Sequence, residues 1–179
     1  MSSFIVWILA LMLSICAGWL DWRSRRIPNW LTVPALVLGL GVNTLARGWP
    51  GMKTALMGSG LCLALLLPFV LLRGMGAGDW KLTGALGAFL GPKLVLLVLL
   101  GSILIGGCMA VVQMIRHRKV KETLHNLVLL MYAAATFGWR GHRELTLDNP
   151  DTLKLPFGVA TAAATLLCFL WVLGLRLRA

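Results

Sequence analysis

Long apolar runs alternate with short polar stretches along almost the whole chain. A sixth, shorter apolar piece, Trp80–Gly91, lies between the third and fourth long runs and ends at the turn sequence Gly91–Lys93. A helix needs roughly 17–25 such residues to cross a hydrocarbon core of about 30 Å, and a shorter one can still span if its end is buried in protein. The pattern therefore predicts an all-α bundle with six transmembrane helices. The five long runs are Phe4–Leu20, Trp30–Ala46, Ala55–Leu72, Leu94–Ile115 and Pro156–Leu175.

Composition supports a polytopic membrane protein with one domain, residues 1–179. Hydrophobic residues make up 59% of the chain and charged residues 13%, whereas soluble domains have about 25% charged residues. The first run is expected to be a retained helix, because MSSF carries no positive charge and Ile15 stands where a lipoprotein signal needs a small residue.

The net charge of +11 fits membrane topology better than nucleic-acid binding, which is not expected because the basic clusters lie beside apolar runs. Twelve of the seventeen Lys and Arg residues become cytoplasmic if the three loops at 21–29, 73–81 and 116–154 do. The positive-inside rule then predicts an external N-terminus. We expect a multi-pass protein of the inner (cytoplasmic) membrane, with the lipid bilayer as a partner.

The segment Val120–Phe137 has two possible placements. Its apolar residues recur at helical spacing, and polar residues crowd one end. We expect a helix that lies in the cytoplasmic interface within a loop at about 116–155. A seventh span is the alternative, and it leaves eleven basic residues inside.

The four cysteines, Cys16, Cys62, Cys108 and Cys168, each lie inside an apolar run and form no CxxC pair. They are expected to be small buried hydrophobic residues. Neither a disulfide nor a metal site is expected, and no cofactor is implied.

Two of the six acidic residues stand at the edge of apolar runs. Asp21 follows the first run, and Asp79 opens the short piece after the third. A charge at membrane depth costs roughly 2.5–3.5 kcal/mol on insertion scales, so such a residue points to function. The topology brings both to the cytoplasmic face, where a carboxylate pair can share one proton. One carboxylate can then activate a water as general base while its protonated partner polarises a scissile carbonyl.

The neighbouring residues suit such a site. Gly74, Gly76 and Gly78 permit close backbone approach. Pro28 ends the first helix or starts the second, and Asn29 is a good N-cap for the second. Asp79 is expected near a helix N-terminus, where the helix dipole favours a carboxylate.

Each aspartate also has a purely structural interpretation. Asp21 is a boundary charge if it pairs with Arg23 or Arg25, and Asp79 is a helix cap if it pairs with Lys81 or Arg73. A proton-coupled transporter also uses paired carboxylates, but no internal repeat is visible. A non-enzymatic assembly factor remains a further alternative.

Three motifs resemble those of the type IV prepilin peptidases. DWRSRRIPN (Asp21–Asn29) resembles their D-x-R-x-x-x-I-P-N element, GAGDWKL (Gly76–Leu82) their GxGD motif, and LPFGVATA (Leu155–Ala162) the start of their last helix. The resemblance implies a membrane aspartic protease that cleaves the basic leader from prepilins or pseudopilins. It implies that Asp21 and Asp79 are the catalytic pair. The supporting residues that it implies are Gly76, Gly78, Lys81, Pro156, Phe157 and Gly158.

The first connection departs from the long family members. It has nine residues, Asp21–Asn29, and no cysteine, whereas the long members carry a cysteine-bearing insertion there and also methylate the new N-terminus. The chain therefore resembles the short peptidases of tight-adherence pilus systems more than the long members. A peptidase of another secretion system and the archaeal preflagellin peptidases are the alternatives. The sequence predicts neither methylation activity nor an oligomeric state.

Overall fold

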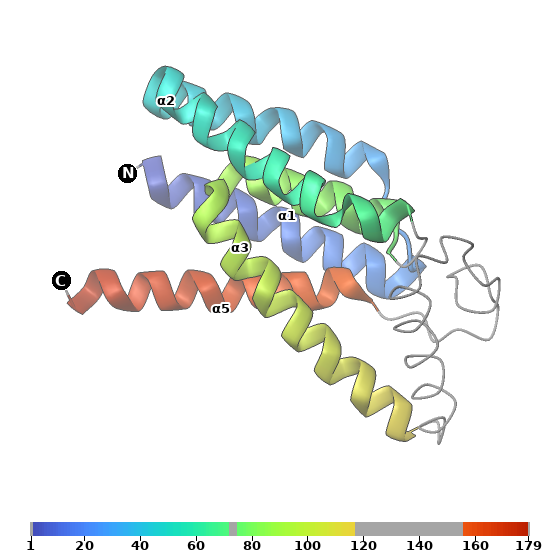
Figure 1. Ribbon diagram of the computed structural model, residues 1–179. Coiled ribbons are helices and arrows are strands. Elements are labelled where there is room, and N and C mark those ends of the chain that lie inside the picture. The colour runs from blue at the N-terminus through green and yellow to red at the C-terminus, as the bar shows by residue number, and fades with distance from the viewer. Residues whose placement is uncertain (1, 72–74, 117–155, 179) are drawn as a thin grey trace.

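The computed structural model describes residues 2–71, 75–116 and 156–178. This part of the chain is all-α, as predicted, and Figure 1 shows its arrangement. Each of its four helices is long and apolar enough to cross a membrane. The segment Val120–Phe137, together with Arg73 and Gly74, lies outside the described residues. The helices are α1 (Ser2–Ser24), α2 (Asn29–Leu71), α3 (Ala77–Arg116) and α5 (Phe157–Arg178).

Two of the helices bend sharply at a glycine. The backbone of Gly48 in α2 has φ 63° and ψ −147°, and that of Gly91 in α3 has φ 75° and ψ 175°. Both lie in the left-handed region, where only glycine is unstrained. Each of these helices therefore consists of two segments that run in roughly opposite directions (Figure 1). The turn predicted at Gly91 is confirmed, and the connection between the second and third apolar runs shrinks to the single residue Gly48.

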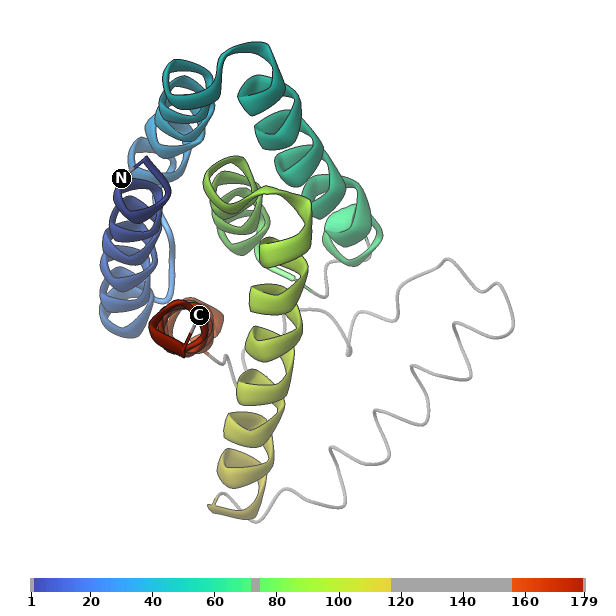
Figure 2. The ribbon, with the colours of Figure 1, turned by 90° about the vertical axis from the view of Figure 1, so that its left-hand side faces the viewer.

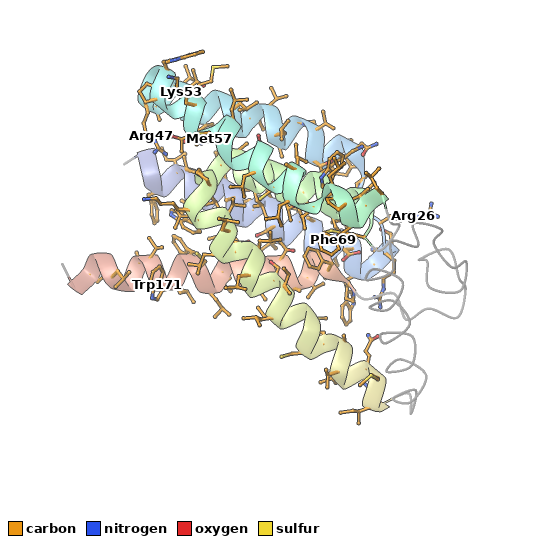
Figure 3. The ribbon with its side chains drawn as sticks, viewed as in Figure 1. Arg26, Arg47, Lys53, Met57, Phe69 and Trp171 are labelled. Carbon is orange, nitrogen blue, oxygen red and sulfur yellow. The ribbon has the colours of Figure 1, made fainter. Side chains whose placement is uncertain are left out.

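Each end of the bundle carries basic side chains. Figure 3 places Arg26 at one end and Arg47 and Lys53 at the other. The Lys53 ammonium lies 5.9 Å from the ring centroid of Trp49, which is cation–π distance. Tryptophan and basic side chains favour the level of lipid headgroups, so these ends fit the two faces of a membrane.

The first segment of α3 is the centre of the fold. Every residue from Leu82 to Gly91 is buried, and Figure 2 shows this segment between the two halves of α2. Gly58 of α2 lies directly against Gly87 of α3, backbone to backbone. A Cβ at Gly84 would lie 2.7 Å from a methyl carbon of Leu63. Small residues thus let this segment sit at the closest possible distance from its neighbours.

Helix α5 packs against α1 and α3 through small residues. A Cβ at Gly18 would lie 3.1 Å from the carbonyl oxygen of Gly158 and 3.2 Å from Cβ of Ala162. On the other side, a Cβ at Gly101 would lie 3.2 Å from that of Ala164. Close approach of this kind is how helices associate where lipid removes the hydrophobic driving force.

The prediction that all four cysteines are buried is half wrong. Cys62 and Cys168 are buried, but Cys16 and Cys108 are exposed on the outer surface of their helices. The error arises because an apolar run does not say which side of a helix faces the bundle. In α1 the inward face is marked by small residues, Ala10 and Ala17, and Cys16 falls off that face.

Candidate functional site at the α1, α3 and α5 ends

The inward face of α1 leads directly to Asp21. Ala10, Ser14 and Ala17 are buried at spacings of three and four residues, and Asp21 continues the same series. Asp21 is only 6% exposed, although the next residue, Trp22, is exposed. Helix periodicity therefore turns this carboxylate into the bundle and not toward solvent.

Helix α1 ends one turn after Asp21. The N–H of Arg25 donates a 2.9 Å hydrogen bond to the carbonyl of Asp21, and Arg25 has φ 53°. A left-handed residue with this bond is a common way to end a helix. The Ser24 hydroxyl also donates to the Leu20 carbonyl at 2.7 Å. This sharp end leaves Ile27 buried within the fold.

The start of α5 holds the Asp21 side chain. The backbone N–H of Gly158 donates a 2.7 Å hydrogen bond to Oδ2 of Asp21. The first N–H groups of a helix have no partner within it, and a carboxylate there is favoured by the helix dipole. A Cβ at position 158 would lie 2.9 Å from Cβ of Asp21, so only glycine permits this contact. Pro156 is buried beside it, and the ring of Phe157 lies against Gly106 of α3.

Asp79 lies in the first turn of α3, as predicted. The turn is closed by the N–H of Trp80, which donates to the carbonyl of Gly76 at 3.2 Å. A Cβ at Gly76 would lie 3.0 Å from Oδ2 of Asp79. A Cβ at Gly78 would lie 2.9 Å from the carbonyl oxygen of Ile27. Both glycines are therefore close-approach positions, one beside the carboxylate and one against the α1–α2 connection.

The structure brings Asp21 and Asp79 to the same end of the bundle, where α1 ends and α3 and α5 begin (Figure 1). The two carboxylates lie close enough for their charges to interact. Arg25 also lies within electrostatic reach of Asp21. Within the described ranges, no group donates a hydrogen bond to the Asp79 carboxylate, so the two acids have unlike surroundings.

Lys81 and Asn29 bond to each other. The Lys81 ammonium donates a 2.9 Å hydrogen bond to Oδ1 of Asn29. The structure thus corrects the prediction that Asn29 is the N-cap of α2, because the carbonyl of Pro28 accepts the first helical bonds instead. The alternative in which Lys81 pairs with Asp79 is not the arrangement found. The bond instead ties the start of α3 to the start of α2.

Sequence reasoning missed the anchor supplied by Trp80. Its indole N–H donates a 2.8 Å hydrogen bond to the carbonyl of Leu63 in α2. This bond fixes the first turn of α3 against the second half of α2. A tryptophan directly after Asp79 was the only signal, since a buried indole usually finds an acceptor.

The arrangement suits acid–base chemistry on a peptide bond. One buried carboxylate is held by a backbone N–H, and a second lies within electrostatic range of it at the same end of the bundle. Such a pair can activate a water and protonate a leaving group. Within residues 2–71, 75–116 and 156–178 there is no cluster of three or more His, Cys, Asp or Glu that could hold a metal ion.

Two curated proteins resemble the chain over part of its length. The chain is 36% identical, over 94 residues, to a prepilin leader peptidase/N-methyltransferase of Xanthomonas campestris, which covers 49% of the chain and 32% of the relative. It is 33% identical over 117 residues to the protein of the same name from Aeromonas hydrophila, covering 62% of the chain and 38% of the relative. The chain therefore matches only about a third of the length of these relatives. No solved structure matches it.

The family model described as the type IV leader peptidase family matches residues 7–111, which is more than half of the chain and includes both aspartates. The chain belongs to the type IV leader peptidase family.

Proposed function

We propose that the protein is a membrane aspartic endopeptidase that cleaves the basic leader from type IV prepilins or pseudopilins on the cytoplasmic side. Family membership supports the reaction class. The observation that carries the site is that Asp21 and Asp79 stand at one end of the bundle, within electrostatic reach of each other. No metal or cofactor is needed for this chemistry, because two carboxylates supply both the base and the acid.

The surroundings of the two acids suggest a division of roles. Asp21 accepts the Gly158 N–H bond, and a hydrogen bond to the charged form favours that form. Two adjacent carboxylates share one proton, so Asp79 is the partner that holds it. Asp21 then acts as general base toward the water, and Asp79 polarises the scissile carbonyl.

The remaining predicted site residues act by shape in this proposal. Gly78 and Pro28 bring the α1–α2 connection, with the unpredicted Ile27, against the start of α3. Gly76 leaves room beside Asp79, and Gly158 leaves room beside Asp21. The Lys81–Asn29 bond and the buried Pro156 with its neighbour Phe157 hold the surrounding helix ends in place.

The fold can cross an inner (cytoplasmic) membrane six times, once each with α1 and α5 and twice each with α2 and α3. The bends at Gly48 and Gly91 divide α2 and α3 into two segments each, and both bends lie away from the site end (Figure 1). Arg26 marks the cytoplasmic face, and Arg47 and Lys53 mark the external face (Figure 3). The N-terminus is then external, as the distribution of charges predicts.

This orientation fits the chemistry of a prepilin. Its basic leader stays at the cytoplasmic surface while its apolar helix stays in the bilayer, so the bond to be cut lies at the interface. Exposed Trp22 and Trp30 flank the α1–α2 connection and fit headgroup level. The short connection between α1 and α2, residues 25–28, further supports the short, tight-adherence type of peptidase.

Co-expression with a candidate prepilin tests the proposal. Asp21→Asn and Asp79→Asn are nearly isosteric but cannot share a proton, so leader loss on a gel should stop while the enzyme remains in the membrane. Asp148→Asn, which changes an acid of the loop predicted at about 116–155, is the matched control and should cleave at the wild-type rate. Wild-type cleavage by either pair variant would refute the assignment, and loss of the membrane protein would indicate a structural pair.

A further inference from the structure

The short segment of α3 that begins with Asp79 ends at a break that leaves two carbonyl groups without helical partners. In an α-helix the carbonyl of residue i accepts the N–H of residue i+4. Residue 92 is proline, so the carbonyl of Ala88 has no N–H to accept. The bend at Gly91 also removes the partner of the Phe89 carbonyl. Unpaired carbonyls buried in a membrane protein are costly.

Asn43 of α2 supplies the missing donors. Its Nδ2 lies 2.8 Å from the Ala88 carbonyl oxygen and 3.0 Å from that of Phe89. Its Oδ1 accepts a 2.8 Å hydrogen bond from Arg47, one turn further along α2. Asn43 is 1% exposed. A buried amide with both ends bonded is rigid, because neither end can turn without leaving a polar atom unpaired.

Two further contacts hold the opposite end of the same segment, where α3 begins. There the Trp80 indole bonds to Leu63 and the Lys81 ammonium bonds to Asn29. All residues between these contacts and Gly91 are buried. A helix is stiff along its axis, so a bond that fixes its last turn also fixes the level of its first turn, where Asp79 lies.

We propose that Asn43 is a positioning residue for Asp79: by bonding to the Ala88 and Phe89 carbonyls it sets the height of the short helix and so the separation of Asp79 from Asp21. This inference rests on the proposed function. It assigns a role to a residue whose contact at Ala88 lies nine residues along α3 from Asp79, a rise of about 13 Å.

Asn43→Leu tests the proposal, because leucine has the same branched arrangement of four side-chain heavy atoms and no donor. Purified wild type and variant are compared for leader cleavage of a prepilin, with kcat, KM and the pH–rate profile measured. A misplacement of about 1 Å can lower a rate roughly hundredfold, so kcat should fall about ten- to hundredfold with KM within twofold of wild type. The profile should also move along the pH axis, because the spacing of two carboxylates determines how their titrations couple.

The pH–rate profile distinguishes a displaced Asp79 from a loss of protein stability. Among the described residues, Arg25 at the end of α1 and the uncharged Gly158 N–H of α5 act on Asp21, and Asp21 acts on Asp79. Lys81 lies on the same helix as Asp79. Asn43→Leu changes none of these charges. A variant that is only less stable would lower the height of the profile without moving it.

Thr44→Ala is the matched control. Thr44 is the next residue of α2, and within the described part of the chain its hydroxyl bonds to the Leu40 carbonyl of its own helix alone. It should keep kcat and the profile within twofold of wild type. If Asn43→Leu does not accumulate, Asn43→Ser takes its place with the same expected result.

An unmoved profile in the accumulating variant overturns the inference, as does failure of both variants to accumulate, because either result means that the amide serves folding alone. If wild-type protein itself cleaves no prepilin, it is the proposed function that fails, and that result is distinct.

Discussion

Asp21 near the end of α1 and Gly158 at the start of α5 are joined by a 2.7 Å hydrogen bond across 137 residues of sequence. Gly158 contributes in two ways. Its backbone N–H stabilises the carboxylate, and its lack of a side chain lets α5 approach α1 closely. Cβ of Asp21 would lie 2.9 Å from a Cβ at position 158, and Oδ2 would lie 3.1 Å from it. Both distances are shorter than ordinary carbon contacts, so any larger residue must displace either the helix or the carboxylate.

Gly158→Ala is therefore expected to lower cleavage strongly while the protein still inserts. A shift of about 1 Å in a reacting group can cost on the order of a hundredfold in rate. The measurement is the initial rate of leader loss per unit of enzyme in membranes. Gly174→Ala is the control on the same helix, because nothing lies within 4 Å of a Cβ there; equal rates for the two variants would contradict the contact.

The two glycines before Asp79 should differ in their sensitivity to alanine. A Cβ at Gly78 meets the backbone carbonyl of Ile27 at 2.9 Å, whereas a Cβ at Gly76 meets only the Asp79 side chain, at 3.0 Å. Backbone yields less readily than a side chain. Gly78→Ala should lower the melting temperature in detergent more than Gly76→Ala. The reverse order would show that the α1–α2 connection is not packed against α3 in this way.

The Lys81–Asn29 bond should be measurable as a coupling energy. A hydrogen bond of this kind contributes about 0.5–1.5 kcal/mol. Lys81→Met and Asn29→Ala should each destabilise the protein by a similar amount, and the double variant should be no worse than the more severe single variant. Additive effects on stability would indicate that Lys81 acts through another partner.

The backbone contact of Gly58 with Gly87 should make both positions intolerant of alanine. Overpacking a well-filled core costs about 1–3 kcal/mol, and here the obstacle is backbone, since a Cβ at Gly58 would also lie 2.8 Å from Gly91. Thermal unfolding in detergent should show a clear loss for Gly58→Ala. Gly60→Ala, two residues away on the open side of α2, should unfold at the wild-type temperature.

Much of the fold could be predicted from the apolar pattern, because each helical segment is a continuous run. The turn at Gly91 was visible because glycine and proline stand together there. The bend at Gly48 was expected to be a longer connection, since Arg47 and Lys53 interrupt the hydrophobic residues. Helix formation overrides that local polarity, because the two charged side chains sit at an end of the bundle (Figure 3).

The candidate site was predictable only in part. Asp21 and Asp79 stood out because acids are rare beside apolar runs. The sequence did not reveal the bond from Lys81 to Asn29 or the role of Asn43, because each depends on which helices are neighbours in the fold. An asparagine within an apolar run indicates a polar contact, but its partners are carbonyls whose need arises at Pro92, in another helix.

The Asp21–Gly158 bond has a consequence for biosynthesis. The carboxylate is translated early and its backbone donor late, so a nascent chain held at the ribosome before residue 158 carries an incomplete centre. Under the proposed function, cleavage would then begin only once the last helix has left the translocon and docked beside α1.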